Sequence, residues 1–334
     1  MRLSSQSCAR PRAGALYSAA VRAWCGLGIL LVVGTVLTGC ERADTDSSTG
    51  TTADVNAKTR RIGVTLLTMQ HQFYQDLRAG MEEAAKQYGY ELLVTAAEQN
   101  STLQANQIDE FIVQQVDAIV VCPCDSHSVG ASIAEANDAG IPVFTADIAS
   151  MSSLGKVVTH VASDNKLGGR KAAELMVAAL SDKGKVAILT HPEVTSVMDR
   201  VAGFKEEIAK HADIEIVAEL STEGRRDKAV RVMEDLLQSE PDLSGVFGIN
   251  DDSALGALAA VEAAGRLERI KIVGYDATPE AREKIRTGAI YGDVIQNPNQ
   301  IGRLTVETIH GFFNGETPPT VIPVEVGTFT REST

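Results

Sequence analysis

Aromatic residues and cysteines are both scarce in this 334-residue chain. Phe, Trp and Tyr together make up 4% of it, and there are five cysteines. Cys8 and Cys25 lie in the N-terminal leader described below and Cys40 directly follows it, so only Cys122 and Cys124 belong to the predicted folded part, which excludes a disulfide framework. The hydrophobic fraction of 44% and the charged fraction of 22% are typical of a soluble globular protein with one large domain or two ordinary ones.

The motifs of the common α/β enzymes are also missing. The first apolar run reads RIGVTLLTMQHQFY and carries no Gly-x-Gly-x-x-Gly, and there is neither a Walker loop nor a Gly-x-Ser-x-Gly elbow. The segment Cys122–His127 matches no standard zinc spacing, so we predict no metal and no cofactor. A tight βα turn with two thiols is expected there, and a strained Cys122–Cys124 disulfide stays open as an alternative. No nucleophile–base pair stands out, so we predict that the chain is not an enzyme.

The first 39 residues have the pattern of a secretory signal. Four arginines precede an uncharged run over 23–39, and the first acidic residue is Glu41. The run ends Leu-Thr-Gly-Cys, which resembles a bacterial lipobox and implies that Cys40 is the lipidated N-terminus of the mature chain. A retained membrane anchor is the alternative, but the run is short for the ~20 residues that span a bilayer. Both interpretations place the folded part outside the cytoplasm, attached to a membrane.

After the leader, the chain is strongly acidic and begins with a segment that has the composition of a linker. Without the leader the chain has 27 basic and 44 acidic residues, a net charge of −17, because four of the 31 basic residues precede Cys40. Such an acidic surface argues against nucleic acid as a partner. Residues 40–59 are rich in Thr, Ser, Asp and Ala, and we predict a disordered linker with a reach of about 24 Å.

From residue 60 onward, short apolar runs alternate with longer amphipathic ones. The expected strands include 62–67, 91–95, 118–121, 141–145 and 157–161, and the expected helices include 73–88, 103–115 and 129–139. The strands are continuous apolar runs rich in β-branched residues, which predicts parallel sheets covered by helices on both faces. About ten strands and an internal similarity between residues 117–147 and 244–276 predict two lobes of one α/β architecture.

A polar residue closes several of the predicted strands. This strand-end set consists of Cys122, Asp147, Asn250, Asp276 and Gln296. Ligands of open α/β sheets bind beyond the carboxyl ends of the strands. A Thr-Pro pair follows Asp276 and an Asn-Pro pair follows Gln296, and both pairs are better N-caps than the residue before them. Asp251–Ser253 are competent caps after Asn250, and no helical pattern follows Asp147. Side chains that are not needed as caps are free to bind a ligand.

These residue types suit a polyhydroxylated ligand. Carboxylates accept hydrogen bonds from adjacent hydroxyls, an Arg fork donates to oxygens, and amides do both. Phe73 and Tyr74 follow the first strand, where aromatic rings would pack on the C–H face of a sugar, although Phe73 is equally suited to the core.

Four stretches resemble the ribose-binding proteins of bacterial ABC uptake systems. They read VASDNKLGGRKAAEL, PDLSGVFGINDDSALGALAAVEAAGR, IVGYDATPE and DVIQNPNQIG, and the likeness runs from about residue 60 to 330. The resemblance implies two Rossmann-like lobes that close on a monosaccharide about a three-stranded hinge. The hinge would cross near 163–164, 296–297 and 325–326. The N-terminal lobe would comprise 60–163 plus 297–325, and the C-terminal lobe 164–296 plus 326–334.

The resemblance also implies ligand-binding residues. The positions that match the family pattern are Phe73, Tyr74, Asp147, Arg200, Asn250, Asp276 and Gln296. His71 and Cys122 stand where ribose binders have Asn, Ile148 where they have Arg, and Gly224 where they have a stacking aromatic. These changes suggest another pentose or hexose, or an open-chain polyol. His71 titrates near neutral pH, which predicts pH-dependent binding. Arg225 and Arg226 reach either the cleft or solvent.

We therefore expect a monomeric, non-enzymatic solute-binding protein that closes on a sugar or polyol and docks an ABC permease. A sensor that presents its ligand to a chemoreceptor or kinase is the alternative. A lactose-repressor-type regulator shares the fold but needs an N-terminal helix-turn-helix, and here a signal segment occupies that place.

Overall fold

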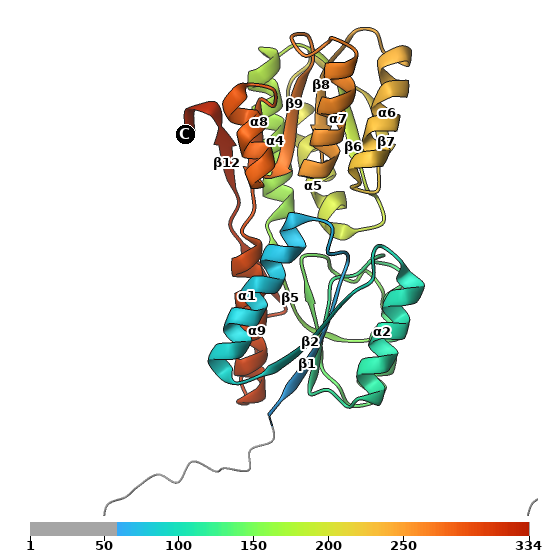
Figure 1. The fold of residues 1–334 in the computed structure, drawn as a ribbon, viewed down its shortest axis with the longest axis vertical. Helices are drawn as coiled ribbons and strands as arrows, with labels where there is room; N and C mark the ends of the chain where they lie inside the picture. Colours follow the sequence, from blue (N-terminus) through green and yellow to red (C-terminus); the bar gives the residue numbers. More distant parts are fainter. Residues whose placement is uncertain (1–58, 334) are drawn as a thin grey trace, which may run out of the picture. The chain divides into compact units, whose positions relative to one another are not determined.

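The computed structural model describes residues 59–333. The predicted signal segment, Cys40 and the linker as far as residue 58 lie outside the described residues. Within 59–333, no helix is long and apolar enough to cross a membrane. The described part of the chain contains two six-stranded sheets, each with its own helices (Figure 1).

The first sheet is built mainly from the N-terminal half of the chain. Its strand order is β11-β5-β4-β3-β1-β2, and all of these neighbours are parallel. The strands are β1 (Arg61–Leu66), β2 (Glu91–Ala96), β3 (Ala118–Val121), β4 (Val143–Ala146), β5 (Val157–Ser163) and β11 (Val321–Val324). Its helices are α1 (Gln72–Tyr88), α2 (Ser101–Val113), α3 (Gly130–Asp138) and α9 (Pro298–Phe313).

The second sheet repeats this order with later strands. It runs β12-β10-β9-β8-β6-β7, and only the β10–β12 pair is antiparallel. The strands are β6 (Gly184–Thr190), β7 (Ile214–Ser221), β8 (Leu243–Gly248), β9 (Lys271–Asp276), β10 (Gly292–Ile295) and β12 (Gly327–Thr330). The helices are α4 (Asn165–Leu180), α5 (Thr195–Ile208), α6 (Arg226–Ser239), α7 (Asp251–Ala263), α8 (Pro279–Thr287) and the short η1 (Arg331–Ser333).

The predicted two-lobed α/β fold is confirmed, and the differences lie at the sheet edges. The interior strand β3 matches its predicted bounds because all four of its residues are buried and apolar. The edge strands β11 and β12 are four residues long and largely accessible, so they carry no buried apolar run that periodicity could detect. The described residues therefore contain twelve strands where about ten are expected, and the antiparallel β12 departs from the all-parallel prediction.

Close helix contacts join distant parts of the chain. Helix α9 returns to pack on α1, as Figure 1 shows. A Cβ atom at Gly80 would lie 2.1 Å from the carbonyl oxygen of Asn299, and one at Gly302 would lie 2.1 Å from that of Leu77. Glycine is required at both positions because the two backbones approach more closely than any side chain permits.

His160 gives the first sheet a predictable response to acid. Its Nδ1 lies 2.9 Å from Thr145 Oγ1, and burial lowers its pKa to about 4. The unfolded chain therefore binds a proton first as the pH falls below about 6.5, and the stability that depends on neutral His160 is lost between that pH and about 4. We expect a loss of about 3 kcal/mol, measured by urea denaturation across this range. A His160→Gln variant should lose the part of this slope that His160 contributes, whereas His127→Gln in an exposed turn should retain the full slope. Equal slopes for the wild type and both variants would contradict the assignment.

Candidate functional site

A cavity lies between residues that follow the carboxyl ends of strands from both sheets. Its empty space is about 400 Å³ when its opening to solvent is counted. Eight of the nine residues predicted as ligand-binding line it, and only Cys122 does not. The predicted residues in the lining are His71, Phe73, Tyr74, Asp147, Arg200, Asn250, Asp276 and Gln296.

Asp147 presents an unused acceptor to this cavity. It follows β4 in a left-handed conformation with φ of 63°, and it is 4% exposed. Its Oδ2 accepts a hydrogen bond of 2.8 Å from Tyr74 Oη, whereas its Oδ1 has no partner among the described residues. Burial raises the pKa of this carboxyl, and the positive charge of Arg200 opposes that shift. A buried carboxylate oxygen without a donor is costly, so the site is built to receive one.

Arg200 is held rigidly against the opposite wall. It lies in α5 and is 4% exposed. Its Nε donates to Asn165 Oδ1 and its Nη1 to the carbonyl oxygen of Ile249, both at 2.8 Å. The guanidinium also lies 3.9 Å from the centroid of the Tyr275 ring. These contacts fix the plane of the guanidinium, which is the requirement for directional donation to a ligand oxygen.

Asp276 and Gln296 form a second acceptor group. Gln296 Nε2 donates to Asp276 Oδ1 at 2.7 Å, and Gln296 Oε1 is buried without a partner among residues 59–333. Thr278 caps α8 and Asn297 caps α9, as the sequence predicts, so neither strand-end residue is consumed by a helix. Burial raises the pKa of Asp276, and Arg200 opposes the shift.

Asn250 departs from the prediction, because it is itself the N-cap of α7. Its Oδ1 accepts a hydrogen bond of 2.9 Å from Ser253 N, and its Nδ2 donates to the carbonyl oxygen of Gly224 at 2.9 Å. The prediction that later residues cap this helix was wrong, since the extended backbone of Asn250 directs its oxygen at the first turn. Asn250 nevertheless lines the cavity.

The other residues singled out near the first and fourth strands and in the Cys-Pro-Cys turn are all buried. Phe73 and Tyr74 are both buried and pack edge to face with ring centroids 5.1 Å apart. Ile148 lines the cavity, so an apolar side chain stands in its wall at that point. Cys122 is fully buried, and desolvation raises the pKa of its thiol. It forms no disulfide with Cys124, and the described residues include no cluster able to hold a metal ion.

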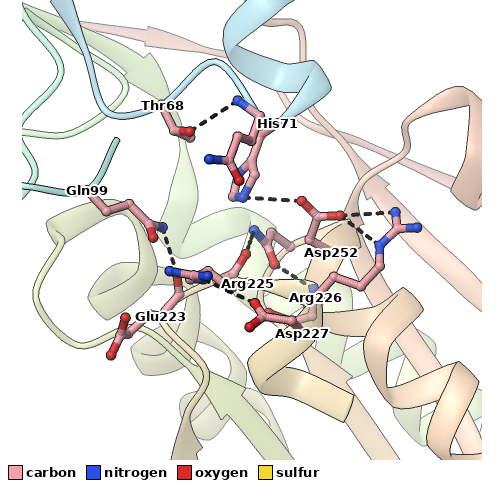
Figure 2. A network of polar contacts seen from close by, with 12 residues as sticks. Thr68, His71, Gln99, Glu223, Arg225, Arg226, Asp227 and Asp252 are labelled. Atoms are coloured by element: carbon pink, nitrogen blue, oxygen red, sulfur yellow. Dashed lines mark hydrogen bonds and ion pairs between the residues drawn. The ribbon is translucent and has the colours of Figure 1, made fainter. Parts of the chain in front are cut away.

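His71 belongs to a polar network at the edge of the cavity (Figure 2). Its Nε2 lies 3.2 Å from Asp252 Oδ2, and Asp252 Oδ1 lies 3.0 Å from Arg226, which also pairs with Glu280 at 2.8 Å. Burial lowers the pKa of His71, although Asp252 opposes this shift. Arg226 therefore reaches the cleft region, whereas Arg225 pairs with Asp227 near the surface.

Sequence reasoning missed the lining residues that follow β6. They are His191, Val194, Ser196 and Val197. The signal was available, because His191 directly follows the buried run that ends at Thr190, but this strand end was not included in the strand-end set. A Cβ at Gly224, where φ is 62°, would lie 3.1 Å from Asn250 Nδ2 and 3.7 Å from His191 Nδ1. A bulky ring at position 224 would therefore need a different backbone.

Comparison with known proteins agrees with this geometry. The model of the periplasmic binding protein domain matches residues 62–317. The ribose import binding protein RbsB of Bacillus subtilis is 34% identical over 78% of this chain and 84% of its own length. The xylitol-binding protein of Mycolicibacterium smegmatis is 33% identical over 79% of this chain and 73% of its own. The crystal structure of a periplasmic solute-binding protein of an ABC transporter from Actinobacillus succinogenes with bound D-allose superposes with a TM-score of 0.77 at 30% identity, covering 82% and 99% of the two chains.

Two lobes of parallel sheet with a polar cavity at their strand ends define a binding protein rather than an enzyme. The chain belongs to the periplasmic binding protein domain family, within the group similar to ribose-binding proteins.

Proposed function

We propose that this chain is the extracytoplasmic sugar- or polyol-binding component of an ABC importer. The observation that carries the proposal is the pair of buried, unpartnered acceptors, Asp147 Oδ1 and Gln296 Oε1, at a cavity that also contains the fixed guanidinium of Arg200. A neutral ligand rich in hydroxyl groups supplies the missing donors. A ligand with its own negative charge would meet Asp147 and Asp276 without enough positive charge to offset them.

The ligand is held by closure of two lobes. We assign 60–163 plus 297–325 to the N-terminal lobe and 164–296 plus 326–334 to the C-terminal lobe, with the hinge at the three crossings between them. Hydrogen bonds across this division support a closed form. Gln99 Nε2 donates to the carbonyl oxygen of Glu223 at 2.9 Å, and Ser126 N donates to that of Glu193 at 3.0 Å. Ligand binding shifts the population toward this form because the ligand contacts both lobes at once.

The type of ligand follows from the walls of the cavity. Gly224 and Ile148 supply neither a stacking ring nor a charged donor, whereas His71 and His191 add polar ring nitrogens. Hydrogen-bonding capacity thus replaces part of the ring-stacking surface. An open-chain polyol, or a sugar other than ribose, fits this wall, and similarity to a xylitol-binding protein supports the same inference.

The proposal also includes attachment of the chain to a membrane and docking on a permease. The lipobox-like sequence ahead of Cys40 supports a lipid anchor, and the 40–59 segment would serve as the tether. The ABC transporter context of the structural relative with bound D-allose supports a permease as the docking partner of the closed form. We expect the chain to act as a monomer.

Calorimetry against ribose, D-allose, xylitol and other monosaccharides and polyols tests the proposal. At least one compound should release or absorb heat with one-to-one stoichiometry and raise the melting temperature. Saturation at 100 times Kd stabilises the folded state by about 2.7 kcal/mol. An Asp109→Ala variant, altered at an exposed position of α2, should behave like the wild type. Absence of heat and of a melting shift for the whole panel would remove sugar and polyol binding as the function.

A further inference from the structure

Two buried carboxyl groups contact each other beside the proposed ligand site. Asp251 is the first residue of α7 and is 3% exposed, while Asp293 lies in β10 and is fully buried. Their side chains lie within hydrogen-bonding reach of each other. Within residues 59–333, neither oxygen of Asp293 nor the Oδ1 of Asp251 accepts a hydrogen bond of normal geometry, although the backbone N–H of Val294 lies close enough to the Asp293 carboxyl to favour its charged form.

Among residues 59–333, the charged groups that act on this pair are acidic. The neighbouring charged groups are the carboxylate of Asp276 on β9 and that of Asp252 on α7, which is already paired with Arg226. Strand β12, which pairs with β10, has the sequence GTFT and carries no titratable side chain. The basic groups nearest along the packed helices are engaged elsewhere: Arg170 of α4 pairs with Glu206, and Arg282 of α8 donates to the carbonyl oxygen of Ala277.

Two adjacent carboxylates without a cation cannot both be charged in a buried site. One proton between them converts the repulsion into a hydrogen bond. Gly274 leaves the space that this arrangement needs, since a Cβ there would lie 3.1 Å from Asp293 Oδ2 and 3.2 Å from Asp251 Oδ1. Burial raises the pKa of both carboxyl groups, and the charge of Asp251 raises that of Asp293 further.

The pair also supports the turn that carries Asp276. Asp251 Oδ2 accepts a hydrogen bond of 2.6 Å from Thr278 N. The two residues before Thr278 have positive φ, 115° for Asp276 and 55° for Ala277, a conformation that costs energy for residues other than glycine. An anchored neighbour is needed to keep such a turn in place.

We propose that Asp251 and Asp293 share one proton, and that this pair fixes the 276–278 turn so that Asp293 acts as a positioning residue for the ligand-binding carboxylate of Asp276. The positioning role rests on the proposed function, whereas the shared proton does not. Asp293 itself does not contact the ligand.

The shared proton is tested without ligand, on the full chain, by urea denaturation between pH 4 and pH 9. A carboxyl whose folded pKa is raised retains its proton where the unfolded chain has lost it, so its contribution to stability falls as the pH rises. The unfolding equilibrium constant of the wild type should therefore rise by up to tenfold for each unit of increasing pH because of the shared carboxyl proton. Asp293→Asn keeps the shape and a donor but binds no proton, so this component should vanish. Parallel profiles for the two proteins would overturn the shared proton.

The positioning role is tested with a ligand that the wild type binds in the calorimetric panel. Asp293→Asn should bind within about threefold of the wild type because its amide still donates to Asp251. Asp293→Val has a similar shape but no donor, and we expect it to bind at least tenfold more weakly. Wild-type affinity in the valine variant would overturn the positioning role.

If the wild type binds nothing in the panel, the proposed function and the positioning role fail together, and the denaturation profiles still decide the shared proton. If the valine variant does not fold, weak binding by Asp293→Asn becomes the overturning result.

Discussion

Replacing Arg200 with alanine is expected to abolish measurable binding of the ligand identified by calorimetry. The change leaves the buried carboxylates of Asp147 and Asp276 without the one guanidinium whose charge acts on both. Removing one partner from a buried charged group typically costs about 3–5 kcal/mol, which corresponds to a loss of more than a hundredfold in affinity. The same change removes the hydrogen-bond donor of Asn165 Oδ1 and that of the carbonyl oxygen of Ile249, so the variant should also melt at a lower temperature.

A lysine at position 200 should not restore binding. A lysine ammonium carries the charge but lacks the planar fork that reaches Asn165 and Ile249 together while lying over the Tyr275 ring. Arg231→Ala is the matched control, since Arg231 is 63% exposed, pairs with Asp227 on α6 and does not line the cavity. We expect wild-type affinity for that control. An affinity within tenfold of the wild type in a folded Arg200→Ala protein would show that the ligand lies elsewhere.

Replacing Asp147 with asparagine should weaken binding and strengthen the unliganded fold. Asparagine is neutral and has only one side-chain oxygen, which Tyr74 Oη can occupy, so the ligand loses a charge-assisted hydrogen bond and we expect a loss of about a hundredfold in affinity. Without ligand, Asp147 Oδ1 is buried and unpartnered, so its replacement relieves a cost that the wild type carries. The melting temperature of the unliganded variant should therefore rise, as expected when a binding site is optimised for its ligand rather than for stability.

Calorimetry and thermal melting of the same Asp147→Asn preparation measure both effects. Asp117→Asn provides a control with a different signature, because Asp117 Oδ2 accepts a hydrogen bond of 2.7 Å from the backbone of Arg61 far from the cavity. That variant should lose some stability and retain its affinity. An Asp147→Asn protein with unchanged affinity would exclude this carboxylate from the site.

The sequence alone predicted the architecture and eight of the residues that line the cavity. Continuous apolar strands such as β3 are buried on both faces, so their composition reports their environment directly. Asp276 and Gln296 could be recognised because Thr-Pro and Asn-Pro pairs that follow them are stronger caps, and both of those caps are formed. Arg200 was found only through resemblance, because an arginine in an amphipathic helix has no local pattern that distinguishes a buried cation from a solvated one.

Tertiary contacts decided what local pattern could not. Asn250 was available both as a cap and as a ligand, and its backbone conformation makes it a cap. Cys122 was predicted to contact ligand, but the structure buries its side chain outside the cavity lining. His191 joined the site because α5 begins there against the opposite half of the molecule, where Thr195 N donates to Ser126 Oγ at 3.0 Å.

The order of apolar and polar residues thus determined two sheets and the side chains at their ends, because burial and capping are local consequences of composition. Which of those side chains lack a partner was decided only in three dimensions. The unpartnered oxygens of Asp147 and Gln296, and the contact between Asp251 and Asp293, depend on groups that are distant in the chain. Hydrogen bonding is satisfied or left unsatisfied by spatial neighbours, and this balance makes the cavity the candidate binding site.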